Sequence, residues 1–139
     1  MTPVVFMSHP VAAYDGHPLN ANIKRAVRWY AALRDCEPTV AFTAPWLLPL
    51  WLGLDDDGDI AQRRKGIAHS AAIAAKCDGI VLCGGRISTG MQAELDAVLA
   101  AGGWVADLTG CGANPPPSCF APVGSLLEMG RGEWARRMA

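Results

Sequence analysis

The chain has 139 residues, of which 51% are hydrophobic and 18% charged, a composition that suits one globular domain with a single core. Its formal net charge is −1, so the overall charge does not favour binding to duplex nucleic acid or to an anionic membrane. No run of about 18 apolar residues is present and the N-terminus lacks a signal-peptide pattern, so we expect no membrane span and a cytoplasmic protein.

The cysteines and histidines argue against a disulfide framework and a metal site. The five cysteines form an odd set without a CxxC pair, which favours reduced thiols. The three histidines lie at no zinc-ligand spacing from a cysteine. The acidic run from Asp55 to Asp59 lacks the glutamate that completes an EF-hand loop, so it favours a solvated turn before a helix, whose N-terminus acidic residues stabilise. We therefore predict neither a metal nor another cofactor.

The first elements along the chain are a strand, a helix and a second strand. The apolar run at residues 4–7 predicts a buried strand, and residues 39–43 predict another. Between them the segment from Asn22 to Leu33 has a helical pattern, with Asn20 or Asn22 as its N-cap. The inward face of this helix is predicted to carry Ile23, Ala26, Val27, Tyr30 and Leu33.

The next segment, residues 45–54, is apolar but is interrupted by Pro49 and Gly53. It is either a loop or short helix that covers the sheet edge, or an exposed apolar surface that another subunit covers. A helix is then expected from about Ile60 to Lys76. Its predicted inward residues are Ile60, Ile67, Ala71 and Ala74 or Ala75.

The second half of the chain repeats the alternation of strands and helices. Strands are predicted at residues 78–83 and 104–108, with a helix at about 90–101 between them and Ser88 or Thr89 as its cap. This alternation predicts an α/β protein with a parallel sheet in a three-layer α/β/α, Rossmann-like or flavodoxin-like arrangement. Residues 1–109 would form this domain. Residues 110–139 would form a Pro/Gly-rich tail with a short helix at 126–138, loosely attached or packed across a subunit interface.

Ligands of open parallel sheets bind beyond the carboxyl ends of the strands. Ser8 and His9 follow the first predicted strand, and Gly84-Gly85 follows the central one. Glycines let backbone N–H groups approach a ligand, and the N-terminus of the following helix favours negative charge. Ser88, Thr89 and Gly90 would therefore suit a phosphate or a sugar hydroxyl.

Glu94 lies one turn into the predicted helix and faces back toward this loop, because helical side chains tilt toward the N-terminus. We expect an exposed carboxylate that the helix dipole keeps ionised. The alternative is a capping box, in which Gln92 or Glu94 bonds back to the cap of its own helix. The local pattern leaves both interpretations open.

A family resemblance rests mainly on Cys77-Asp78 and on the motif Ile87-Ser88-x-Gly90-Met91-x-x-Glu94. Together with several weaker matches, this combination resembles the nucleoside 2-deoxyribosyltransferase-like superfamily. Within that superfamily it is most similar to the short phage and bacterial branch called DUF4406. The resemblance covers residues 4 to about 108. The weaker matches are Ser8-His9-Pro10, Asn22, Ala26, Ala44-Pro45 and Arg63.

The resemblance implies that Glu94 is a nucleophile that attacks the anomeric carbon of a nucleoside. The resulting covalent glycosyl-enzyme would be resolved by water or by another base. It also implies that Asp78 helps to handle the base. The full predicted set of substrate-binding residues is Ser8, His9, Asp78, Gly84, Gly85, Ser88, Gly90 and Met91.

The sequence departs from the family pattern at two positions. The tyrosine that orients the nucleophile in the family falls on Phe6, which has no hydroxyl, and Tyr14 or His9 would have to substitute for it. The carboxylate six residues before the glutamate becomes Ser88, which could instead hold a phosphate. We therefore expect a nucleoside or nucleotide N-glycosidic-bond enzyme, either a hydrolase or a deoxyribosyltransferase, that forms a homo-oligomer. The alternatives are a non-catalytic nucleotide-binding sensor and a purely structural interaction protein.

Overall fold

The computed structural model describes residues 1–12, 16, 18–54, 59–116 and 125–139. Tyr14 and Asp55–Asp57 of the acidic run therefore lie outside the described residues, as does the end of the Pro/Gly-rich segment. The described strands form one parallel sheet of four strands in the order β2-β1-β3-β4. These strands are β1 (Val4–Ser8), β2 (Ala41–Thr43), β3 (Gly79–Leu82) and β4 (Trp104–Asp107).

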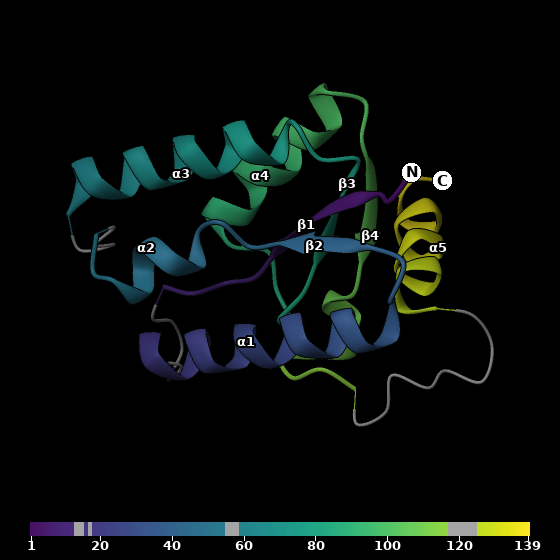
Figure 1. Ribbon diagram of the computed structural model, residues 1–139, viewed down its shortest axis with the longest axis horizontal. Coiled ribbons are helices and arrows are strands. Elements are labelled where there is room, and N and C mark those ends of the chain that lie inside the picture. The colour runs from purple at the N-terminus through teal and green to yellow at the C-terminus, as the bar shows by residue number, and fades with distance from the viewer. Residues whose placement is uncertain (13–15, 17, 55–58, 117–124) are drawn as a thin grey trace.

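Helices cover both faces of this sheet (Figure 1). Helix α1 (Leu19–Cys36) lies on one face, and α3 (Ile60–Ala74) and α4 (Thr89–Ala100) lie together on the other. Right-handed crossovers explain why the helices lie on opposite faces. The chain moves along the sheet in one direction from β1 to β2, and in the opposite direction from β2 to β3 and from β3 to β4. The predicted three-layer α/β/α fold with a parallel sheet is confirmed. Short elements follow β2 and β4, namely α2 (Leu47–Trp51) and the 3₁₀ turn η1 (Thr109–Cys111).

The core is centred on the two middle strands. Residues 5–7 of β1 and 80–82 of β3 are fully buried, as expected for strands covered on both faces. Phe6 pairs with Ile80 in the register of these strands, and Ser8 pairs with Leu82 at their carboxyl ends. The pairing therefore brings residue 8 and the loop after β3 to the same edge of the sheet.

Helix α1 begins earlier than predicted, and its capping differs. Its N-cap is Pro18, which makes no side-chain hydrogen bond, whereas both predicted caps, Asn20 and Asn22, lie inside the helix, and Asn22 is buried. The Asn22 amide donates hydrogen bonds to the carbonyls of Val11 and Ala12, at 3.1 and 3.2 Å. Asn22 was wrongly predicted as a cap, because its side-chain amide donates to the loop after β1 and its Oδ1 accepts from the Arg25 side chain, not from a backbone N–H at the start of the helix.

The inward faces of the helices also differ in part from the prediction. Val27 is 46% exposed, and Trp29 is buried instead, with its indole N–H donating to the Ala113 carbonyl at 2.8 Å. On α3, Asp59 is the N-cap, and Ile60, which was predicted to face inward, is 69% exposed. Ile60 occupies the first helical position, where the helix has not yet reached the sheet. None of the described helices is long and apolar enough to cross a membrane.

The described cysteines are not all reduced. Cys36, at the end of α1, is disulfide-bonded, whereas Cys77, Cys83 and Cys111 are free. The prediction of reduced thiols throughout was therefore wrong for Cys36. The spacing of cysteines along a chain does not reveal which sulfurs the fold brings together.

The C-terminal helix α5 (Leu126–Met138) belongs to the same folded unit as the rest of the chain. It packs against β4 and buries Leu126 and Leu127 (Figure 1). The Leu127 N–H donates to the Glu37 carboxylate at 3.1 Å, and Arg137 lies 2.5 Å from the buried Asp107 carboxylate. The expectation of a loosely attached tail after residue 109 was therefore wrong, because α5 covers β4 of its own chain.

Two glycines of α5 offer a test of this docking. A Cβ on Gly130 would lie 3.0 Å from the Ala106 side chain and from the Asp107 backbone nitrogen, whereas one on Gly132 would meet nothing within 4 Å. Gly130→Ala should lower the free energy of unfolding by about 1–2 kcal/mol through overpacking. Gly132→Ala should raise it by about 0.5–1 kcal/mol, because alanine favours the helix. Urea unfolding measures both, and equal stabilisation by the two substitutions would contradict the docking of α5 on β4.

Candidate functional site

An open pocket of about 160 Å³ lies beyond the carboxyl ends of β1 and β3. Its wall combines residues of the loop after β1, α2 and the residue before it, α3, the loop after β3, and the start of α4. This is the edge at which open parallel sheets bind ligands. The lining residues are His9, Val11, Ala12, Trp46, Leu50, Arg63, Gly66, Ile67, Ser70, Arg86, Ser88, Thr89, Gly90, Met91 and Glu94.

The pocket wall is mixed in character. The indole N–H of Trp46 donates to the Met7 carbonyl at 2.8 Å, which holds the ring in place as part of the apolar lining. Two cationic side chains, Arg63 of α3 and Arg86 of the loop after β3, line the same pocket. Such a wall suits an organic molecule with both an apolar part and an anionic group.

The N-terminus of α4 forms another part of the wall. The Ser88 hydroxyl caps the helix by accepting from the Met91 N–H at 3.3 Å, as predicted. The Ser88 N–H in turn bonds to the Met91 sulfur at 3.4 Å, so Met91 completes the capping box. Glu94 therefore does not take the capping role that the alternative interpretation assigned to it.

Glu94 is buried at the inner side of this pocket. Only 6% of the residue is exposed, and its Oε1 accepts a hydrogen bond of 2.6 Å from the Ser8 hydroxyl. Burial raises the pKa of Glu94 to about 8, and the Ser8 hydrogen bond opposes this rise. The expectation of an exposed carboxylate kept ionised by the helix dipole was wrong, because the loss of water outweighs the helix terminus.

His9 is the second buried titratable group that lines the pocket. Its Nδ1 lies 2.7 Å from the Pro10 carbonyl, so Nδ1 carries the proton and Nε2 is the unprotonated nitrogen. Nε2 is buried and has no hydrogen-bond partner among the described residues. Burial lowers the pKa of His9 to about 4, which keeps the ring neutral at pH 7.

The two predicted ligand-binding glycines shape the loop without lining the pocket. Gly84 and Gly85 have positive φ angles of 93° and 86°. A Cβ on Gly84 would lie 2.7 Å from Pro10 and 2.8 Å from the His9 ring, so only glycine lets the two loops pack. A Cβ on Gly85 would crowd the backbone of Ala113 at 3.1 Å. Their role in this structure is therefore to bring the loop after β3 against its neighbours.

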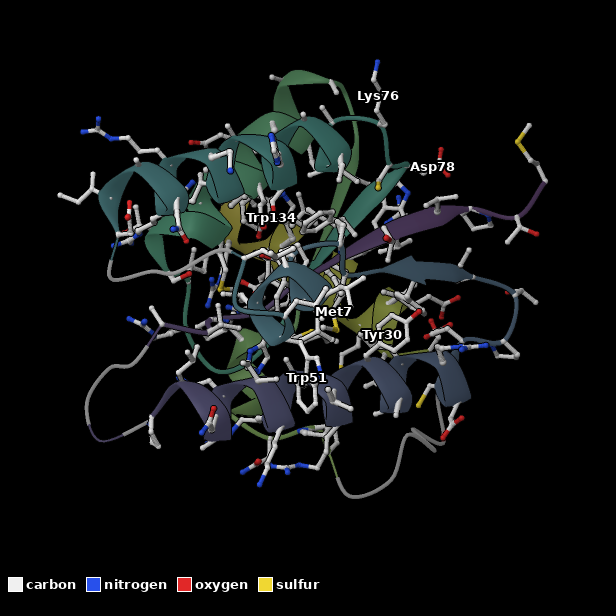
Figure 2. The ribbon with its side chains drawn as sticks, turned by 60° about the vertical axis from the view of Figure 1, so that its left-hand side comes forward. Met7, Tyr30, Trp51, Lys76, Asp78 and Trp134 are labelled. Carbon is white, nitrogen blue, oxygen red and sulfur yellow. The ribbon has the colours of Figure 1, made fainter. Side chains whose placement is uncertain are left out.

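Asp78 does not join the other predicted residues. It precedes β3 at the amino end of the sheet, where its Oδ2 accepts from the Val4 N–H at 2.7 Å. Figure 2 shows Asp78 beside the start of β1. In this position the carboxylate tethers the start of one strand to its neighbour and lies far from the pocket that most of the other predicted residues line.

Five of the predicted site residues line the pocket, and several lining residues were not predicted. Trp46, Leu50 and Ile67 come from segments that were interpreted as sheet cover or core. Arg86 directly follows Gly84-Gly85 in the sequence, and this position could have indicated that it lines the pocket. The predicted residues that line the pocket are His9, Ser88, Gly90, Met91 and Glu94.

The described residues contain no group of three or more His, Cys, Asp or Glu side chains placed to hold a metal ion. The fold and the pocket thus define a small α/β protein with a ligand pocket at the carboxyl edge of a parallel sheet. A family described as a domain of unknown function, DUF7768, matches residues 3–105, and the chain belongs to this family. A search of curated proteins found no match. The family match carries no activity, so the resemblance to deoxyribosyltransferase-like proteins and DUF4406 stays a prediction.

Proposed function

We propose that this protein cleaves or exchanges the N-glycosidic bond of a nucleotide, with Glu94 as the nucleophile. The observation that carries the proposal is a buried glutamate in a pocket that also holds an indole ring and two arginines. Trp46 and the apolar lining suit a nucleobase, and Arg63 and Arg86 suit a phosphate. A carboxylate among them suits the positive charge that develops on the sugar ring.

The proposed reaction has two steps. The Glu94 carboxylate attacks C1′ of the sugar while the C–N bond breaks, and the bond's electron pair leaves with the base, which gains a proton from water. Water then attacks C1′ of the glycosyl ester and gives its proton to the hydroxide left by the first step, which restores the carboxylate and releases the sugar. In the transfer reaction a second base takes the place of that water. Because the first step needs the ionised carboxylate, the rate is expected to rise with pH up to about 8.

Base release from nucleosides and their 5′-monophosphates, followed by chromatography, is the direct test. Product from at least one substrate supports the proposal, and a screen in which no substrate gives product contradicts it.

The second candidate is a nucleotide-binding sensor. The raised pKa of Glu94 favours it, because a neutral carboxyl can both donate to and accept from a ribose hydroxyl. Binding by calorimetry without any product would select this candidate.

Two adjacent arginines of α3 test the preference for a phosphate. Both are exposed, but Arg63 lines the pocket and Arg64 does not. Arg63→Ala is expected to weaken binding of a nucleoside 5′-monophosphate about tenfold, the effect of losing one charged hydrogen bond. Binding of the matching nucleoside should change little, and Arg64→Ala should leave both affinities unchanged. Calorimetry measures all of these, and equal losses from the two variants would contradict a phosphate contact at Arg63.

We further propose that this enzyme acts as a homo-oligomer. Large apolar side chains are exposed on and after α2, next to the Trp46 and Leu50 wall of the pocket. Figure 2 shows one of them, Trp51. Such a surface supports the interpretation that a second subunit covers this segment. These exposed residues are Leu48, Trp51, Leu52 and Leu54.

A further inference from the structure

Ser8 is held rigidly at the carboxyl end of β1. It is fully buried, it pairs with Leu82 across the sheet, and its carbonyl accepts from the Cys83 N–H at 2.9 Å. The backbone at this position therefore has little freedom, because it lies between covered strands in the middle of the sheet. The place of the Ser8 hydroxyl is set by the sheet and does not depend on a ligand.

Ser8 does not line the pocket, although it was predicted to bind substrate. Its hydroxyl instead donates to Glu94 Oε1 at 2.6 Å, across 86 positions of the chain. A hydroxyl-to-oxygen distance this short indicates a strong hydrogen bond. Ser8 can therefore act on a ligand only through Glu94.

Among the described residues, a hydrogen bond engages only one oxygen of the Glu94 carboxylate. Ser8 engages Oε1, and Glu94 as a residue lines the pocket. His9, which neighbours Ser8 and also lines the pocket, directs its Nδ1 proton to Pro10 and so does not compete for the carboxylate. The contacts at Glu94 thus distinguish its two oxygens.

We propose that Ser8 is a positioning residue for Glu94, which holds Oε1 so that Oε2 faces the substrate carbon. This inference rests on the proposed function, because it assigns Oε2 as the attacking atom. The hydroxyl also favours the ionised form of Glu94, since it donates to a carboxylate that burial would otherwise keep protonated. Glu94 therefore owes both its orientation and its reactive form in part to a residue outside the pocket.

The test compares the wild type with Ser8→Ala, Ser8→Thr and Ser70→Ala. Ser70 is a matched control, because it is a buried serine that lines the same pocket from α3. The readout is the titration of the Glu94 side-chain carboxyl by ¹³C NMR, with the resonance assigned by its loss in Glu94→Gln. Ser8→Ala is expected to raise the titration midpoint by about one pH unit, the value of a hydrogen bond to a charged group. Ser8→Thr should restore the midpoint, and Ser70→Ala should leave it in place.

Kinetics extend the test if the protein turns over a nucleotide. Ser8→Ala should lower kcat about tenfold with little change in KM, and the alkaline shift of its pH profile should match the NMR shift. An unchanged Glu94 midpoint in folded Ser8→Ala would overturn the proposal, as would an equal shift in Ser70→Ala. If no substrate is turned over, the proposed function fails, and the NMR titration still decides whether Ser8 controls Glu94.

Discussion

Replacing Glu94 with glutamine is expected to lower base release by on the order of 10³-fold or more, because an amide is not a nucleophile. Glutamine has nearly the same shape, and its carbonyl oxygen can still accept the hydrogen bond from Ser8. The fold and the binding of nucleotide should therefore survive the substitution. Chromatography of released base measures the rate, and calorimetry measures the binding that remains.

Asp96→Asn is the matched control for this experiment. Asp96 lies on the same helix, α4, but is exposed and bonds to Gln92 on the surface. The control variant should release base at the wild-type rate. Turnover by Glu94→Gln that equals that of the wild type would contradict a nucleophilic glutamate, and the binding candidate would then be the better account of the pocket.

The same substitution should change how stability depends on pH. The folded-state pKa of Glu94 is raised from 4.5 to about 8, chiefly by burial, so the unfolded chain loses its proton first as pH rises. The stabilisation that neutral Glu94 contributes is fully present below pH 4.5 and is lost as pH rises through about 8. Glu94→Gln has no such group, so its stability should not show this loss.

The difference in unfolding free energy between Glu94→Gln and the wild type should therefore grow in favour of the variant between these two pH values. The expected slope is about 1.4 kcal/mol per pH unit. His9 acts in the opposite direction. Its pKa is lowered to about 4, so its contribution is present above its ordinary value of 6.5 and is lost as pH falls through about 4.

Comparison of the two proteins removes the His9 contribution, because both retain that residue. Urea unfolding from about pH 5 to about pH 9 measures the difference. Parallel stability curves for the two proteins would mean that Glu94 titrates near its ordinary pKa, and hence that it is not buried as the structure has it. The outcome does not depend on any substrate.

The layered fold could be predicted from the sequence because its signals are local. Apolar runs at residues 4–7 and 78–83, each followed by turn residues and a helical pattern, are enough to define β1 and β3 and the helices between them. Capping is local as well, so Ser88 was predicted correctly as a helix cap. Asn22 was not a cap, because an asparagine whose buried amide bonds to the preceding loop has the same sequence signature as a cap.

The attachment of α5 depended on contacts that no local pattern carries. Its sequence predicts a helix, but a proline- and glycine-rich segment separates it from β4. Gly130 marks the close approach to β4, and Arg137 pairs with a buried aspartate 30 positions earlier in the chain, Asp107. A glycine and an arginine in a surface-like helix do not by themselves reveal such a partner.

The sequence by itself determined where the pocket lies, since strand ends and a glycine-rich turn before a helix follow from local chemistry. Only the tertiary structure decided what the residues there do. It gave Glu94 of α4 a serine partner from β1 and a raised pKa, because burial and contact depend on segments far apart in the chain. Asp78 lies at the amino ends of the strands, away from the pocket, whereas Arg63 and Arg86 come from different segments and line the same pocket. The hydrogen bond between Ser8 and Glu94 and the burial of Glu94 away from water arise only when the chain is packed. Neither can be predicted from the order of residues along the chain.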